Sequence, residues 1–141
     1  MFAPTRTTLA AGKSVTLTLP IRLENPLNNS QGMTRGGNIA RSKKRKAIRT
    51  SVKWHVVAEV QKATGERPPQ MLPITVQLTR ISPGTLDAFD GLPASLKSTV
   101  DGIADAFDLR DDDHRFTWLP PKQQKSKPGV FGVMIEIETR T

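Results

Sequence analysis

Aspartates are concentrated in one stretch of the chain, and their spacing is suited to metal chemistry. Eight aspartates and no glutamate lie between positions 87 and 113. Asp87 and Asp90 precede a predicted helix, and Asp111, Asp112 and Asp113 follow it. Carboxylate oxygens are the ligands that Mg²⁺ and Mn²⁺ prefer. Such an ion can polarise a phosphodiester and activate water at neutral pH. The pattern therefore predicts a divalent-metal site built from both groups of acids.

This metal site requires the two groups of acids to meet. The helix between them has about 15 residues and a length of about 22 Å, so its two flanking loops would have to bend back over the sheet. The alternative is that the acids are ordinary cap and turn residues, with Asp90 as the helix cap. Lys97 could stabilise charge on a phosphate, or pair with Asp101 one helical turn away. Asp105 and Asp108 are interpreted as solvated.

Positive charge is concentrated in the other half of the chain. The net charge is +8, but residues 1–64 hold 12 Lys/Arg against 2 Asp/Glu, whereas residues 65–141 hold 9 against 11. Cations that displace counterions from phosphate are the basis of nucleic-acid binding, although a solvated basic surface is the alternative. The predicted DNA-binding residues are Lys43, Lys44, Arg45, Lys46 and Arg49 in a helix, and Lys122, Lys125 and Lys127 in a later loop.

Composition excludes several other classes of protein. The chain has no cysteine and no tyrosine, which excludes disulfides, zinc–thiolate sites and a tyrosine nucleophile. No apolar run approaches the roughly 18 residues that cross a bilayer, and the first residues lack the apolar core of a signal peptide. With 141 residues, we expect one domain over residues 1–141. We also expect a cytoplasmic protein with no membrane partner and no small-molecule substrate.

Hydrophobic periodicity predicts a mixed α/β (α+β) fold, in which two main helices pack on a small mixed sheet. Apolar residues at fourfold spacing predict the helices, and alternation predicts the strands. Residues 120–129 are predicted to be a basic loop. The predicted strands are 14–19, 74–81, 116–119 and 130–138, and the predicted helices are 40–63 and 93–107.

Residues 86–118 resemble the core of RusA-like Holliday-junction resolvases. That family has an Asp, then Asp-Asn, a Lys in the following helix, and an Asp-Asp pair before the next strand. The matching residues are Asp87, Asp90, Lys97, Asp101, Asp112 and Asp113, followed by Phe116-Thr117-Trp118. Thr18-Leu19-Pro20 and Asn25-Pro26-Leu27-Asn28 also look like the family's first strand and its Pro/Asn loop.

The resemblance implies a homodimer that cuts four-way or other branched DNA with Mg²⁺ or Mn²⁺. It implies catalytic roles for Asp87, Asp90 and Asp113 and a supporting role for Lys97, with Asp112 as a further metal ligand. Gly91 stands where the family usually has Asn, and two residues rather than one separate the first two acids. These departures support an alternative, a non-catalytic DNA-binding protein that keeps the fold with a degraded metal site.

Overall fold

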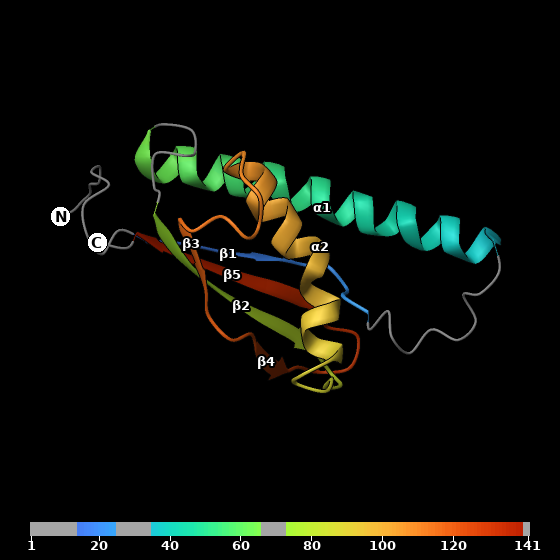
Figure 1. Cartoon of the computed structure of the whole chain (residues 1–141). Coiled ribbons are helices and arrows are strands. Elements are labelled where there is room, and N and C mark those ends of the chain that lie inside the picture. The colour runs from blue at the N-terminus through green and yellow to red at the C-terminus, as the bar shows by residue number, and fades with distance from the viewer. Residues whose placement is uncertain (1–13, 25–34, 66–72, 140–141) are drawn as a thin grey trace.

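The computed structural model of the chain describes residues 14–24, 35–65 and 73–139, with the backbone alone for residues 35–38. Its described part contains five strands and two helices, which confirms the predicted mixed α+β class (Figure 1). The Pro/Asn segment 25–28, which contributes to the family resemblance, lies outside the described residues. Among the described helices, none is long and apolar enough to cross a membrane.

The sheet has both antiparallel and parallel pairs. Strand β5 (Gly132–Thr139) lies between β1 (Ser14–Leu19) and β2 (Ile74–Ser82) and pairs antiparallel with both. The other edge of β2 pairs in parallel with β3 (Phe116–Trp118) along its first residues and with β4 (Lys122–Lys125) along its last ones. Two short strands thus share one edge of the longest strand, and Leu119 and two prolines lie between them.

Strand β4 falls within the predicted basic loop, so the prediction of a loop over residues 120–129 is wrong for these four residues. Its sequence, Lys-Gln-Gln-Lys, has no apolar alternation, and three of its four side chains are exposed. The strand forms because the second half of β2 offers backbone groups that need partners. An alternating pattern of apolar residues arises only where one face of a strand is buried. Because most side chains of β4 are exposed, its sequence carries no such pattern.

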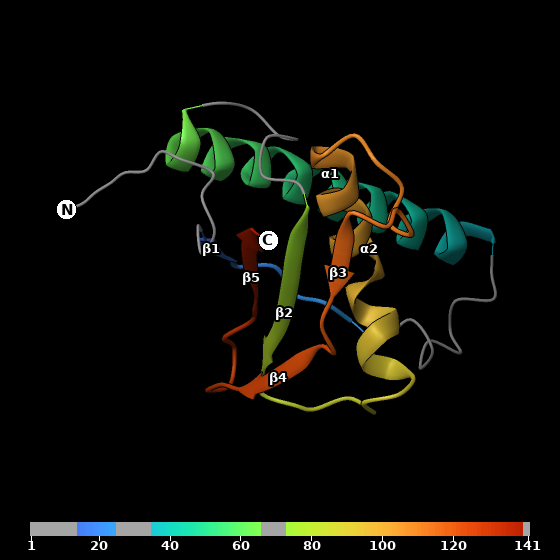
Figure 2. The ribbon, with the colours of Figure 1, turned by 60° about the vertical axis from the view of Figure 1, so that its left-hand side comes forward.

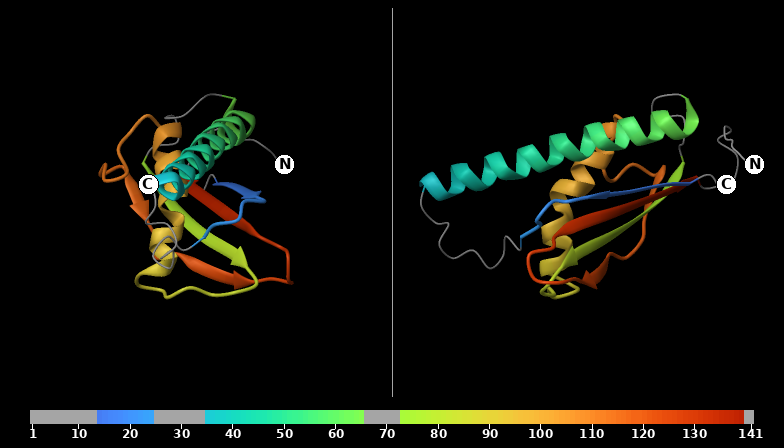
Figure 3. Two further views of the ribbon diagram at one scale, coloured as in Figure 1. Left: turned by 90° about the vertical axis from the view of Figure 1, so that its right-hand side faces the viewer. Right: turned by 180° about the vertical axis from the view of Figure 1, so that it is seen from behind.

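Both helices lie on one face of the sheet, as Figures 1 and 3 show. Helix α1 (Arg35–Thr64) begins five residues before its predicted start and is about 45 Å long. It ends at Thr64, and the next residue, Gly65, has a φ of 78°, a left-handed conformation that glycine adopts without strain. Helix α2 (Gly91–Ala106) crosses α1 and connects β2 to β3.

The core lies between the helices and the sheet. The fourfold stripe of α1 is fully buried in its second half, where Val52, Val56 and Val60 have no exposed surface. Leu96 and Ile103 of α2 are buried equally well. The strands contribute alternate residues to the same core, as in β1, where every second side chain is buried. The opposite face of the sheet carries polar and half-exposed side chains.

The two helices approach most closely at Gly102. A Cβ atom at this position would lie 2.6 Å from the carbonyl oxygen of Arg49 and 2.7 Å from the Cβ of Val52. Since real Cβ atoms do not come so close to other atoms, the crossing depends on glycine. This contact brings the middle of α1, which carries basic residues, beside the acidic surface of α2.

Candidate functional site

Asp87 and Asp90 lie in the turn that leads into α2. The Oδ1 atom of Asp87 accepts hydrogen bonds from the backbone N–H groups of Phe89 (2.8 Å) and Asp90 (3.0 Å). Asp90 occupies the N-cap position, but its side chain makes no capping hydrogen bond. Asp87 therefore stabilises the turn with one oxygen, while the Asp90 carboxylate is exposed and has no capping role.

The segment before this turn is fastened to the sheet by two polar side chains. Gln123 of β4 accepts a hydrogen bond from the N–H of Leu86 (2.7 Å) and donates one to its carbonyl oxygen (2.8 Å). Arg80, which is buried, donates to the carbonyl oxygens of Gly84 (3.0 Å) and Leu23 (3.2 Å). The segment that leads from β2 to the turn is thus held beside β4, and Figure 2 shows the connection between β2 and α2 passing next to this strand.

Strand β4 places its two lysines on opposite faces of the sheet. Gln123 and Lys125 pair with Arg80 and Ser82, whose side chains are buried on the helix-covered face. Because side chains alternate along a strand, Lys125 shares that face and Lys122 lies on the open one. Of these two predicted DNA-binding lysines, Lys125 is therefore the one on the side of the Asp87 turn. The third, Lys127, is exposed just beyond the strand.

Lys97 contacts the loop that follows α2 rather than the turn before it. Its Nζ lies 2.8 Å from Asp111 Oδ2 and 3.0 Å from Asp101 Oδ1. The second contact confirms the predicted pair one helical turn apart. Hydrogen bonds from Lys97 lower the pKa of Asp111, and those to Asp111 and Asp101 raise the pKa of Lys97. The loop thus folds back along α2 to its middle, but no further.

Arginines that are close in sequence hold Asp112 and Asp113. Arg115 donates two guanidinium hydrogen bonds to Asp113, of 3.0 and 3.1 Å, and its backbone N–H donates a third of 2.9 Å. These bonds lower the pKa of Asp113 to about 2. Arg110 Nη2 lies 3.1 Å from Asp112. Neither arginine is among the predicted site residues, although each lies two positions from its aspartate in the sequence.

The structure does not bring the two predicted groups of acids together. Asp87 follows the carboxyl end of β2, and Asp113 precedes the amino end of β3, which pairs in parallel with the start of β2. The loop with Asp111, Asp112 and Asp113 reaches back only to the middle of α2, where Asp111 contacts Lys97, whereas Asp87 and Asp90 precede the first residue of this helix. Figure 2 shows one loop near each end of α2. The described residues contain no cluster of three potential metal ligands, so the expected single pocket of Asp87, Asp90, Asp112 and Asp113 is not formed.

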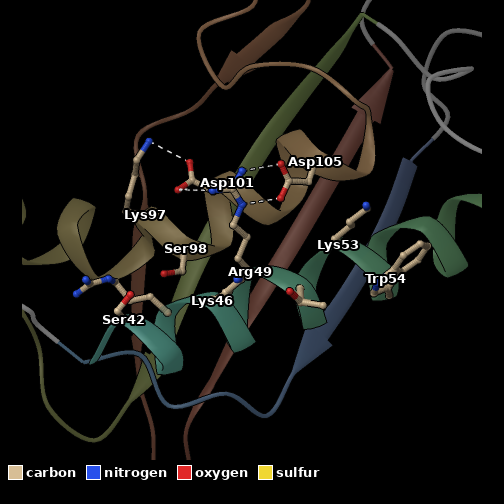
Figure 4. Close-up of a pocket in the computed structure, with 11 residues that line it drawn as sticks. Ser42, Lys46, Arg49, Lys53, Trp54, Lys97, Ser98, Asp101 and Asp105 are labelled. Carbon is tan, nitrogen blue, oxygen red and sulfur yellow. Dashed lines mark hydrogen bonds and ion pairs between the residues drawn. The ribbon is translucent and has the colours of Figure 1, made fainter. Parts of the chain in front are cut away.

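The basic residues of α1 have different partners. Lys43, Arg45 and Lys46 are exposed, and Lys44 Nζ lies 3.1 Å from Glu24. Arg49 instead donates two hydrogen bonds, of 2.6 and 2.8 Å, to Asp105 of α2 (Figure 4). The bond to Asp105 raises the pKa of Arg49, and the same bond lowers the pKa of Asp105. The prediction that Asp105 is simply solvated is wrong, because it joins the two helices.

Comparison with known proteins neither supports nor contradicts the resemblance to RusA-like resolvases. No model of a protein family matches the chain, and no curated protein matches it. The resemblance to RusA-like resolvases therefore depends on the sequence motifs alone, of which the stretch between positions 86 and 118 is the specific one.

Proposed function

We propose that this chain is a metal-dependent endodeoxyribonuclease of the RusA-like type, which hydrolyses phosphodiesters at four-way or other branched DNA junctions. The observation that supports this most is the position of the Asp87 turn beside β4, fastened by the two hydrogen bonds between Gln123 and Leu86. A metal nuclease needs carboxylates next to cations that hold phosphate. The turn supplies Asp87 and Asp90, and Lys125 of β4 lies on the same face of the sheet as Gln123, which fastens the segment before the turn.

The proposed cofactor is Mg²⁺ or Mn²⁺, which would polarise the phosphodiester and activate water. Asp87 and Asp90 share one turn, in which the Asp87 carboxylate accepts a hydrogen bond of 3.0 Å from the backbone N–H of Asp90. Both oxygens of Asp113 are engaged by Arg115, and Asp112 is paired with Arg110, so neither fits the same ion in this arrangement. We therefore propose Asp87 and Asp90, rather than Asp112 and Asp113, as the ligands of the ion. We also propose a homodimer, from the resemblance, and a cytoplasmic location, from the composition of the chain.

A second candidate, a non-catalytic DNA-binding protein with the same fold, is favoured by the separation of the acids. In this case Asp112 and Asp113 serve only to order the loop after α2, through Arg110 and Arg115. The buried Gly91, which replaces the family's usual Asn, also leaves the turn without an amide ligand. Binding of branched DNA by the exposed lysines and arginines would remain.

Cleavage of a synthetic four-way junction in Mg²⁺ separates the two candidates. The nuclease proposal predicts metal-dependent cuts in the wild type that Asp87→Asn and Asp90→Asn abolish, with junction binding retained. Asp113→Asn tests whether the distant loop takes part in the same site. The matched control is Asp108→Asn, because Asp108 is an exposed aspartate just after α2 in a left-handed conformation that Asn also tolerates.

The outcomes separate the two candidates and also test which residues form the site. Cleavage that survives both Asp87→Asn and Asp90→Asn would show that the site is assigned to the wrong turn. Tight junction binding by the wild type with no cleavage in Mg²⁺ or Mn²⁺ would favour the non-catalytic candidate. If Asp113→Asn abolishes cleavage as well, the loop after α2 must rearrange when DNA or metal binds.

A further inference from the structure

A groove of about 530 Å³ lies between α1 and α2 (Figure 4). Arg49, Asp101 and Asp105 form its middle, where α2 crosses α1 and the carboxylate of Asp105 binds the guanidinium of Arg49. Arg45 and Lys46 line it from one side of this crossing, and Lys53 and Trp54 lie further along α1. This groove is distinct from the Asp87 turn, which lies at the start of α2.

The groove carries positive charge that is not neutralised. Arg49 is paired with Asp105, and Lys97 with Asp101 and Asp111. By contrast, Arg45, Lys46 and Lys53 form no ion pair with any residue in the described part of the chain. Arg45, Arg49 and Lys53 recur every four residues, so they form a row along one face of α1 with steps of about 6 Å.

Trp54 gives the groove an aromatic surface. Its side chain lines the groove and remains 51% exposed, which is unusual for the largest apolar side chain. Lys53 Nζ lies 4.6 Å from the centre of its ring. A cation beside an exposed ring attracts a negatively charged group and leaves aromatic surface on which a planar molecule can stack.

We propose that the groove between α1 and α2 binds a single DNA strand, with an unpaired base stacked on Trp54 and the phosphates beside Arg45 and Lys46. Proteins that bind single strands combine a cationic groove with aromatic side chains on which bases stack. In a duplex the base faces are covered by neighbouring pairs, so Trp54 selects a strand that is unpaired. This inference rests on the proposed function for the identity of the ligand, and it adds the form in which the DNA is bound.

Binding of a fluorescently labelled 15-nucleotide oligothymidine to the full chain, measured in EDTA, tests this inference separately from cleavage. Trp54→Ala is expected to weaken binding about fivefold or more, since stacking of one base contributes about 1–3 kcal/mol. Trp54→Phe should retain most of the affinity, because its ring still stacks. Lys46→Ala should weaken binding and reduce the slope of log K against log salt by about 0.7.

The matched controls lie on α1 but do not line the groove. His55→Ala removes an exposed ring next to Trp54, and Lys62→Ala removes an exposed lysine paired with Glu59. Both should bind the oligothymidine as the wild type does. Oligothymidine should also quench the tryptophan fluorescence of the wild type, and this quenching should disappear in Trp54→Phe, whose remaining Trp118 lies beside Asp111.

The results distinguish this inference from the proposed function. If Trp54→Ala binds oligothymidine as tightly as the wild type, or if a duplex competes more strongly than the single strand, the inference is overturned even where junction cleavage is intact. If Trp54→Ala loses binding while the wild type never cleaves, the inference stands and the nuclease proposal fails. A wild type that neither binds nor cuts any DNA would contradict both.

Discussion

Replacement of Gly102 by alanine tests the crossing of the two helices. At a solvent-exposed position within a helix, replacing glycine by alanine stabilises the protein by about 1 kcal/mol, because alanine is the better helix former. Here the new Cβ would lie 2.6 Å from the Arg49 carbonyl oxygen and 2.7 Å from the Val52 Cβ. Val52 has no exposed surface, and Arg49 is tied to Asp105 by two hydrogen bonds, so neither side can move away easily.

We expect this overpacking to outweigh the gain in helix propensity. Overpacking of a buried site is destabilising by about 1–3 kcal/mol, and for contact with a backbone atom we take the upper end of this range. The net decrease in the free energy of unfolding is then about 1–2 kcal/mol. For a domain of this size, each kcal/mol lowers Tm by about 4 °C.

Thermal and urea unfolding followed by circular dichroism would measure this change. The control is Gly84→Ala, because a Cβ at Gly84 would meet no heavy atom within 4 Å. This control should leave Tm unchanged or raise it slightly, through the lower entropy of the unfolded chain. If Gly102→Ala is as stable as the wild type or more stable, the helices do not meet at this glycine, and the groove between them has a different shape.

Three further predictions concern the charged residues. A double-mutant cycle with Arg49→Ala and Asp105→Asn should give a coupling energy of about 1 kcal/mol in urea unfolding, small because both side chains are partly exposed; zero coupling would contradict the bidentate pair. The Asp113 carboxyl should titrate with a pKa of about 2 in a ¹³C NMR experiment, and Arg115→Ala should return it towards 3.8. Since the folded pKa is the lower one, this pair stabilises the protein above about pH 4, and the contribution is lost as the pH falls through 2; an unshifted titration would refute the pairing. Lys125→Ala should reduce the salt slope of junction binding by about 0.9 if Lys125 contacts phosphate, and an unchanged slope would remove it from the interface.

Most of the fold could be predicted from the sequence, because elements with one buried face carry apolar residues at the regular spacing of a helix or a strand. Val52, Val56 and Val60 predicted the buried stripe of a helix, and all three are fully buried. Alternation over residues 14–19 predicted a strand whose bounds are those of β1. β4 was missed because it forms by pairing with an available edge, and its exposed Lys-Gln-Gln-Lys sequence carries no such period.

The candidate site was predictable only where its contacts are local. The Lys97–Asp101 pair follows from helical spacing and is present at 3.0 Å. The Arg49–Asp105 pair joins residues 56 positions apart, so it depends on how the helices cross. The separation of Asp87 from Asp113 likewise depends on the parallel pairing of β2 and β3. This pairing cannot be predicted from the spacing of the aspartates along the chain.

The break between β3 and β4 also affects how the sheet meets other molecules. Pro120 and Pro121 have no N–H group to offer at this edge, and the carbonyl oxygen of Pro120 already accepts a hydrogen bond of 2.7 Å from Gln77. Lys122 and Lys125 then add exposed charge along the same rim. Such an edge is a poor template for a strand from another molecule and protects against aggregation. Fibril growth by strand addition would therefore begin more readily at β1, the regular edge on the opposite side.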